Sequence, residues 1–152
     1  MNDEALITEF DRIIGATQYM VLATADANGL PWATPVWFAS DDGREFYWVS
    51  AHEARHSKNI AARHELAITI FDSTQRPGTG EGAYLSAVGG EVPSAEIDAG
   101  IEIYSAASVR AGLAEFSRAH VEPPSRLRLY RATAHERFVL DAGDRRVNVP
   151  MP

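Results

Sequence analysis

The sequence predicts a mainly β (α+β) fold, with a small antiparallel barrel of about six strands and helices at its periphery. Segments rich in β-forming residues follow one another through short connections as far as residue 92, and Asn-Gly and Asp-Gly turns join the early ones. The glycine-rich strand-to-helix turn of a parallel α/β fold is absent. A length of 152 residues and a hydrophobic content of 45% fit a single domain over residues 1–152.

Composition excludes several classes of function. The net charge of -7 argues against a dedicated nucleic-acid or anionic-membrane binder, so an anionic ligand must be met by a local basic cluster. Without cysteine there is no disulfide, thiolate metal site or cysteine nucleophile. The N-terminus lacks a signal-peptide pattern, and no apolar run approaches the ~20 residues that span a bilayer. We therefore expect a cytoplasmic protein.

The first part of the chain is predicted to be a helix followed by a three-stranded antiparallel meander. The helix is expected over residues 4–15 and the strands over 19–24, 32–38 and 45–50. Pro35 cannot donate to a strand ladder, so we expect it at a sheet edge, a bulge or an interruption of pairing. An interrupted edge would leave backbone groups free for a flat ligand, and an ordinary edge strand beside a loop is the simpler alternative.

The rest of the chain is predicted to alternate helices and strands. We expect a short helix at 57–64, a strand at 66–71, a loop at 72–82, a strand at 83–92, a weak helix after Ser94, a helix at 109–120 and a long strand at 127–141. The strand at 66–71 looks buried on both faces. Gly89 and Gly90 indicate a bulge or bend where the barrel closes, and a second bulge is expected near Thr133.

One stretch, Arg55-His56-Ser57-Lys58-Asn59-Ile60, concentrates positive charge in this acidic protein. It lies between two predicted strands, where a short helix begins. The free N–H groups and positive dipole end of a helix start, reinforced by Arg and Lys, can hold a phosphate. A solvated charged turn is the alternative explanation. We interpret the stretch as the phosphate site of a flavin-type cofactor.

The order of these features resembles the pyridoxamine 5'-phosphate oxidase-like FMN-binding split β-barrel family. The resemblance rests on a strand ending in Ala-Thr, an Asn-Gly turn, a Pro-Val-Trp-Phe strand, a Phe-Tyr-Trp-Val strand and then Arg-His-Ser-Lys-Asn-Ile, and it is strongest over residues 18–72. It implies a homodimer that holds flavin mononucleotide (FMN) in clefts between subunits. It also implies an FMN-dependent oxidoreductase that transfers hydride to or from a small molecule.

The resemblance further implies which residues bind the cofactor. Arg55, His56 and Lys58 would hold the phosphate, and because many members carry Lys at the position of His56, this site could be weaker or pH-dependent. Strand residues 34–37 would line the isoalloxazine ring and residues 48–50 the ribityl chain. The segment 135–138 resembles a His-Asp-Arg-Phe segment of the oxidase that touches flavin and substrate. The predicted cofactor-binding residues are therefore Thr34, Pro35, Val36, Trp37, Trp48, Val49, Ser50, Arg55, His56, Lys58 and Arg137.

The chain also departs from the true oxidase. Thr34 and Thr133 stand where that enzyme has arginines, and the second of these arginines contacts the substrate phosphate. We therefore expect a substrate other than pyridoxamine phosphate. Among the tryptophans, Trp37 and Trp48 are better candidates for ligand contact than Trp32, and barrel core or dimer interface is the simpler explanation for all three.

Three alternatives remain open at this level. A deazaflavin (coenzyme F-420)-dependent reductase would use the same cleft, and a non-catalytic flavin-binding protein would lack turnover. His52-Glu53-x-x-His56 matches the zinc-hydrolase motif, which requires both imidazoles on one helix. No catalytic residue is assigned, because in flavin chemistry the ring itself carries the hydride.

Overall fold

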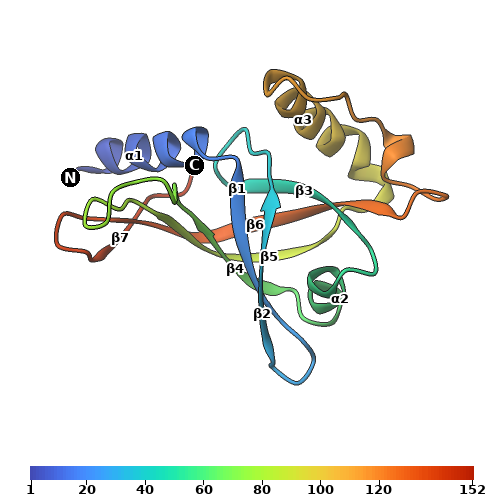
Figure 1. Cartoon of the computed structure of the whole chain (residues 1–152), viewed down its shortest axis with the longest axis horizontal. Coiled ribbons are helices and arrows are strands. Elements are labelled where there is room, and N and C mark those ends of the chain that lie inside the picture. Colours follow the sequence, from blue (N-terminus) through green and yellow to red (C-terminus); the bar gives the residue numbers. More distant parts are fainter.

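The computed structural model describes residues 1–152 and is organised around one antiparallel sheet of seven strands (Figure 1). The strands are β1 (Tyr19–Ala25), β2 (Pro31–Trp37), β3 (Glu45–Ala51), β4 (Glu65–Ile70), β5 (Ala83–Glu91), β6 (Leu127–Leu140) and β7 (Arg146–Asn148). Their order is β2-β1-β4-β5-β6-β3, and β7 pairs with β6. The sheet curls without closing, so the predicted fold class, a split β-barrel with peripheral helices, is confirmed.

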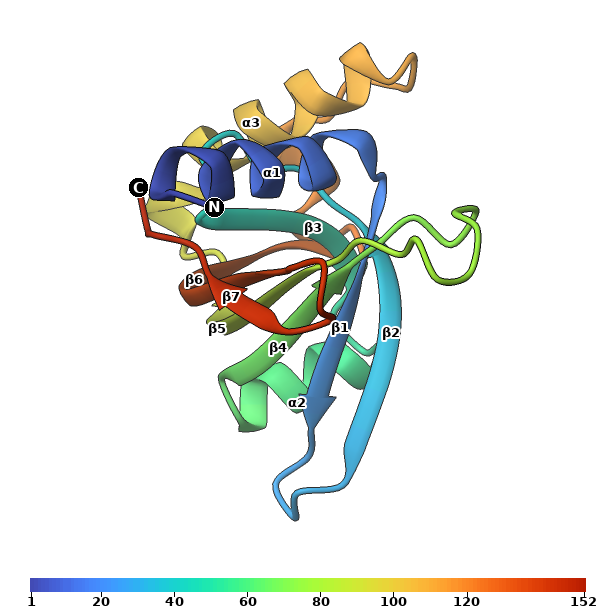
Figure 2. The ribbon, with the colours of Figure 1, turned by 90° about the vertical axis from the view of Figure 1, so that its left-hand side faces the viewer.

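Three helices surround the sheet: α1 (Asp3–Ala16), α2 (Arg55–Ala62) and α3 (Ile97–Arg110). Two short 3-10 turns lie on either side of α3 in the chain: η1 (Ser94–Glu96) precedes it and η2 (Arg118–His120) follows it. In both ribbon views α2 lies at the end of the sheet opposite to α1 and α3 (Figures 1 and 2). None of these helices is long and apolar enough to cross a membrane.

Two apolar clusters hold these elements together. The larger fills the inside of the curved sheet, where Met20, Leu22 and Phe46 are completely buried and Phe10 of α1 covers one end. The smaller lies on the other side of β3 and β6, where α3 packs on Tyr47 and neighbouring residues. Alternation along β3 therefore sends successive side chains into two different cores.

The predicted meander is wrong in one respect, because β3 does not follow β2 in the sheet. β1 and β2 form the expected hairpin, but β3 pairs with β6, with Tyr47 opposite Arg131 and Trp48 opposite Tyr130. The indole of Trp48 stacks on the Tyr130 ring with centroids 5.6 Å apart. The alternating pattern of a strand fixes its two faces but carries no information about its neighbour, so only the tertiary structure selected β6.

The helix predicted over residues 109–120 is also wrong. α3 ends at Arg110, and Gly112 follows with a φ of 76°, a conformation that suits glycine and stops a helix. The chain then folds back on α3, where the Ser108 hydroxyl donates to the Ala114 carbonyl at 2.6 Å. Phe116 packs edge-on against Tyr104 at 5.0 Å. The apolar residues that resembled one face of a helix are therefore contacts of an irregular return segment.

β4 alternates and is not buried on both faces. Leu66, Ile68 and Ile70 point into the main core, whereas Ala67 is exposed.

Two expected irregularities of the strands are present. Pro35 does lie on an edge strand, since β2 ends the strand order. The register shift of β6 falls at His135, two residues beyond Thr133, opposite the Ser86–Ala87 step of β5. The bulge near Thr133 is therefore confirmed.

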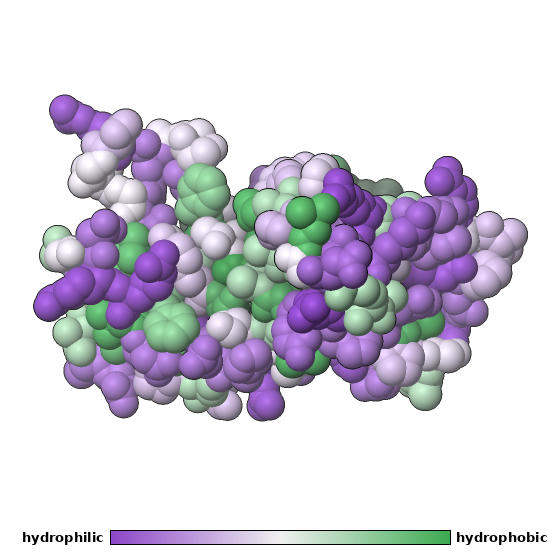
Figure 3. Space-filling view, turned by 90° about the horizontal axis from the view of Figure 1, so that it is seen from below, coloured by the Kyte–Doolittle hydropathy of each residue, from purple (hydrophilic) through white to green (hydrophobic).

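The outer face of β2, β1 and β4 carries a row of exposed small side chains. Ala33 pairs with Ala23, and Ala23 pairs with Ala67 on its other side. We call these three residues the outer alanine row. A shallow groove of about 380 Å³ runs beside it along β1, β4 and β5. Seen from below, hydrophobic side chains reach the molecular surface in the middle and on the left, between hydrophilic ones (Figure 3).

The Gly89-Gly90 pair marks a close approach rather than a bulge, because the β5–β6 register runs through it unbroken. A Cβ on Gly89 would lie 2.7 Å from Leu66 Cδ2 and 3.1 Å from the Arg131 carbonyl oxygen, whereas a Cβ on Gly90 would meet nothing within 4 Å.

We therefore expect Gly89→Ala to lower the free energy of unfolding by about 1–3 kcal/mol through overpacking. Gly90→Ala is the matched control and should change it by less than about 0.5 kcal/mol. Urea unfolding of the three proteins measures both effects. Equal stabilities of the two variants would contradict the close-approach explanation.

Candidate anion site at the start of helix α2

Helix α2 is attached to the sheet by buried polar contacts. Its inner side carries Ser57, Asn59 and Ile60, all of them buried. The Ser57 hydroxyl donates to the carbonyl of Ala51, the last residue of β3, at 2.8 Å. The Asn59 amide donates to the Thr24 hydroxyl of β1 at 3.1 Å. These bonds fix α2 relative to two strands and determine which residues point outward.

The outward residues of the first turn are Arg55 and Lys58. Both are exposed, and neither takes part in a salt bridge. Six other basic residues do pair with carboxylates, namely Arg12, Arg118, Arg126, Arg128, Arg131 and Arg145. Lys58 is also the only lysine in the chain. Two uncompensated cations therefore lie close together on one short helix.

The helix start itself is open. Ala54 occupies the N-cap position and provides no side-chain cap, and the first helical hydrogen bond runs from the Lys58 N–H to the Ala54 carbonyl at 3.0 Å. The preceding N–H groups of the first turn are thus left for an external acceptor. The first turn contains no acidic residue. Free N–H groups, the helix dipole and two cations together favour an anion.

His56 faces the strand end instead of the solvent. Its Nε2 lies 2.8 Å from the Ser50 hydroxyl oxygen, and the side chain is half-buried. Burial lowers the pKa of His56 below its usual value of 6.5. The imidazole is therefore neutral at neutral pH, and it offers the site a hydrogen bond but no positive charge.

Strand β2 meets this site through Trp32 and Thr34. The guanidinium carbon of Arg55 lies 4.3 Å from the centroid of the Trp32 ring. The Trp32 Nε1–H donates to the Thr34 hydroxyl at 3.1 Å. Among the predicted residues, Thr34, Ser50, Arg55 and His56 are thus linked into one neighbourhood by observed contacts, with Lys58 on the same helix turn.

Other predicted residues lie away from this neighbourhood. Val36 and Trp48 are buried in the main core, and the Trp48 Nε1–H has no hydrogen-bond partner. Trp37 and Val49 pack against the second core, where the Trp37 ring meets Tyr104 edge-on at 5.0 Å. Pro35 is exposed on the opposite face of β2. The side chains of residues 34–37 therefore face different environments, and only Thr34 adjoins α2.

The structure does not bring Arg137 to this site. It is 1% exposed, and its guanidinium donates to the carbonyls of Pro150 and Gly43 while it lies over the Phe10 ring at 4.8 Å. Its donors are thus used to hold the C-terminal segment against α1. The resemblance of residues 135–138 to a four-residue segment of the oxidase indicated ligand contact, but within this chain the side chain has a structural role.

The geometry of a zinc site is also absent. His52 and Glu53 lie in the turn before α2, so the two histidines of the motif do not share a helix. Arg126 binds Glu53 at 3.3 Å, and Ser50 binds His56. No group of three His, Asp or Glu side chains is placed to hold a metal ion.

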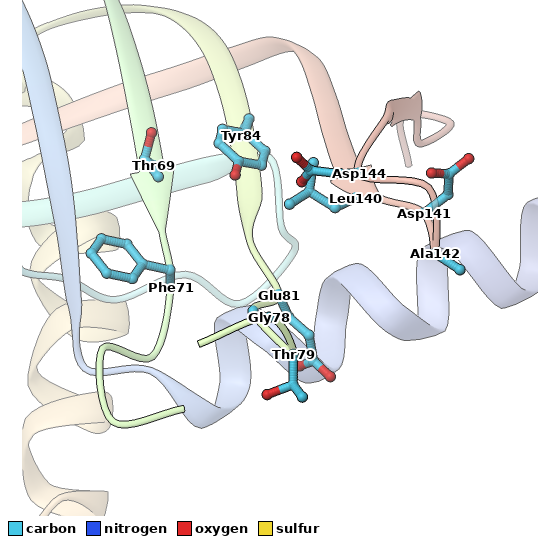
Figure 4. Close-up of a pocket in the computed structure, with 11 residues that line it drawn as sticks. Thr69, Phe71, Gly78, Thr79, Glu81, Tyr84, Leu140, Asp141, Ala142 and Asp144 are labelled. Atoms are coloured by element: carbon cyan, nitrogen blue, oxygen red, sulfur yellow. The ribbon is translucent and has the colours of Figure 1, made fainter. Parts of the chain in front are cut away.

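A large cavity lies elsewhere, between the loop before β5 and the turn after β6 (Figure 4). It has a volume of about 1020 Å³. Carboxylates of Glu81, Asp141 and Asp144 line it, and none of the predicted cofactor-binding residues does. Arg12 engages Glu81 and Arg145 engages Asp141. This acidic rim does not suit an anionic cofactor.

The open antiparallel barrel with peripheral helices makes the molecule a split-barrel protein, and the start of α2 is its candidate anion site. A family model described as pyridoxamine 5'-phosphate oxidase matches residues 6–139. The chain therefore belongs to the pyridoxamine 5'-phosphate oxidase family, as its sequence predicted. None of the curated proteins matches it.

Several solved structures share this fold. A heme binding protein from Mycobacterium smegmatis has a TM-score of 0.71 at 19% identity. The match covers 93% of this chain and 56% of that protein. HutZ, a heme storage protein from Vibrio cholerae, has a TM-score of 0.66 at 20% identity and coverages of 91% and 95%. ChuZ from Campylobacter jejuni has a TM-score of 0.77 at 14% identity and coverages of 98% and 61%. The chain thus spans little more than half of the first and third of these proteins.

Sequence reasoning ranked Trp32 below the other two tryptophans, yet it alone contacts a residue of the anion site. Alternation along β2 offered a signal, because Trp32 shares a face with Thr34. Asn59 was not singled out either. Its role depends on Thr24, which lies 35 residues away and meets it only in the folded chain.

The lowered pKa of His56 predicts a pH effect on stability. Between the unfolded pKa of 6.5 and the lower folded pKa, the unfolded chain binds more protons, so this contribution is complete above about pH 6.5 and is lost as the pH falls. His56→Gln keeps a polar partner for Ser50 and removes the titration. Urea midpoints at about pH 7.5 and 5.5 should therefore differ less in the variant than in the wild type. His64→Gln, at an exposed position, is the control. A difference between the two urea midpoints that is the same in His56→Gln as in the wild type would contradict the lowered pKa of His56.

Proposed function

We propose that this protein binds FMN with the phosphate at the start of α2 and acts as a flavin-dependent oxidoreductase on a small molecule. The observation that carries the proposal is the pair of uncompensated cations, Arg55 and Lys58, beside an uncapped helix start in a chain of net charge -7. Membership in the pyridoxamine 5'-phosphate oxidase family supports it.

Each part of the site has a distinct task in this proposal. The guanidinium of Arg55 can form paired hydrogen bonds to phosphate oxygens, and Lys58 adds a compact charge. The N–H groups of the first turn of α2 complete the phosphate contacts. Ser50 and His56 offer neutral hydrogen-bonding groups next to them. The bound flavin ring would supply the hydride chemistry, and the chain's residues orient it.

Two other cofactors compete with FMN in this proposal. Heme enters because two of the similar structures are a heme binding protein and a heme storage protein. Heme propionates could pair with Arg55 and Lys58, but His56 already contacts Ser50 through Nε2, and the nearby His52 Nε2 lies 3.3 Å from the Glu53 carboxylate. A deazaflavin has a longer anionic tail, yet the next cation along α2, Arg63, is used on the Asp26 and Ala27 carbonyls. The side chains present therefore favour the compact FMN phosphate.

We also propose that two copies of the chain associate through the outer alanine row, as a homodimer with cofactor sites at its interface. Ala23, Ala33 and Ala67 form an exposed, small-residue surface on the outside of the sheet. Small side chains allow a second sheet to approach closely, and burial of apolar surface would stabilise the pair. The free edge of β2 lies beside this surface.

The cofactor proposal predicts the effect of neutralising the two cations. Arg55→Met and Lys58→Met should each weaken FMN binding by about tenfold to a hundredfold, because each removes charge-assisted contacts of about 1.5–3 kcal/mol. Quenching of flavin fluorescence during titration measures the dissociation constants. Arg110→Met is the control, since it makes the same charge change on the exposed end of α3.

The same titrations with heme and with a deazaflavin distinguish the three cofactors. Undiminished FMN affinity in the double variant would contradict the phosphate site. Tighter binding of heme than of FMN by the wild type would replace the proposed function with heme binding.

The dimer proposal predicts the effect of a charge in the outer alanine row. Light scattering should give the mass of two chains for the wild type and of one chain for Ala67→Arg, because a buried, unpaired guanidinium is costly. Ala106→Arg places the same side chain on the exposed surface of α3 and should remain a dimer. A wild-type mass of one chain would contradict the proposal.

A further inference from the structure

Trp32 is an exposed aromatic residue beside the anion site, and none of the proposed phosphate contacts uses it. The residue is 39% exposed near the end of the β1–β2 hairpin, and the Arg55 guanidinium carbon lies 4.3 Å from the centroid of its ring. A tryptophan on an acidic protein surface is a good partner for a cation, because its ring face carries negative potential. The contact joins β2 to the first residue of α2.

The ring is held in place from two sides. Its Nε1–H donates to Thr34, two residues along the same strand face. The hairpin that carries it is tied to α2 by the Asn59–Thr24 bond at 3.1 Å. Arg63 adds hydrogen bonds to the carbonyls of the hairpin turn, at 3.3 Å to Asp26 and 3.5 Å to Ala27. The ring and the helix start therefore keep a fixed relation.

Stacking on the indole leaves the chemistry of Arg55 intact. A guanidinium that lies over a ring uses its flat face, so its in-plane N–H groups stay available for an oxyanion. No carboxylate forms a salt bridge with Arg55, although the charge of Arg55 contributes to lowering the pKa of Asp26. A long side chain that is already held in place loses less freedom when it binds a ligand.

We propose that Trp32 is a positioning residue for the anion site. Its indole holds the Arg55 guanidinium in place at the start of α2, and Trp32 itself does not contact the phosphate. The inference rests on the proposed function, because it assigns Arg55 to a phosphate ligand. It also accounts for a large aromatic residue that remains partly exposed at the tip of a hairpin.

The ligand-free part of the proposal can be tested by the indole N–H signals in a nitrogen–proton correlation spectrum. The chain has three tryptophans, and the signal lost in Trp32→Phe identifies Trp32. Arg55→Met should shift this signal, and Arg63→Met, which removes a contact between the same helix and hairpin, should leave it nearly unchanged. Addition of inorganic phosphate to the wild type should also shift it.

The ligand-dependent part calls for a double-mutant cycle on binding of FMN. Trp32→Leu should weaken binding about fivefold in the wild type and less than about twofold when Arg55 is already Met, since its effect passes through Arg55. Trp32→Phe keeps an aromatic face and should recover part of the affinity. A purely structural role would not make the loss depend on Arg55. Thermal unfolding confirms that each variant is folded.

The outcomes distinguish failure of the positioning role from failure of the proposed function. The positioning role is overturned if Arg55→Met leaves the Trp32 signal unshifted. It is also overturned if Trp32→Leu weakens binding equally in the wild type and in Arg55→Met. If phosphate shifts the signal but FMN does not bind, the proposed function fails and the cycle on phosphate affinity decides the role of Trp32. If neither ligand binds, both proposals are overturned.

Discussion

The placement of α2 on the end of the sheet depends on a pair of buried side-chain hydrogen bonds. Asn59 reaches Thr24 on β1, and Ser57 reaches the end of β3. An unsatisfied buried polar group costs about 1–3 kcal/mol, so rotation of the helix that broke these bonds would be unfavourable. With the inner side fixed, Arg55 and Lys58 have no orientation left except outward. The outward position of these two cations is thus a consequence of the hydrogen bonds made by the opposite side of the helix.

The charge distribution of the chain makes the two cations of α2 important for the proposed binding of an anion. Most of the molecule is acidic, and many of its arginines are neutralised by carboxylates or used on backbone carbonyls. Attraction of an anion therefore depends on the cations that form neither kind of contact, and two of them share the first turn of α2. His56 does not add to this charge, because burial beside Ser50 keeps its imidazole neutral. Arg55, held on the Trp32 ring, and Lys58 are left to supply it.

The shared fold does not determine the ligand. Proteins with fewer than a quarter of their residues identical to this chain have the same barrel, and they include a heme binding protein and a heme storage protein. A split barrel provides an open end and a helix beside it, and the side chains placed there decide what binds. In this chain the imidazole contacts a hydroxyl and the guanidinium rests on an indole, an arrangement that suits a phosphate.

The sequence by itself determined the family, the barrel class, the hairpin of β1 and β2 and the basic stretch on α2, because turn residues, alternation and charge are local properties. Only the tertiary structure decided that β3 pairs with β6, that Arg137 is buried and that Trp32 meets Arg55. These facts depend on contacts between residues far apart in the chain. A strand pattern gives the faces of a strand but not its neighbour, and a charged residue does not reveal in sequence what neutralises it.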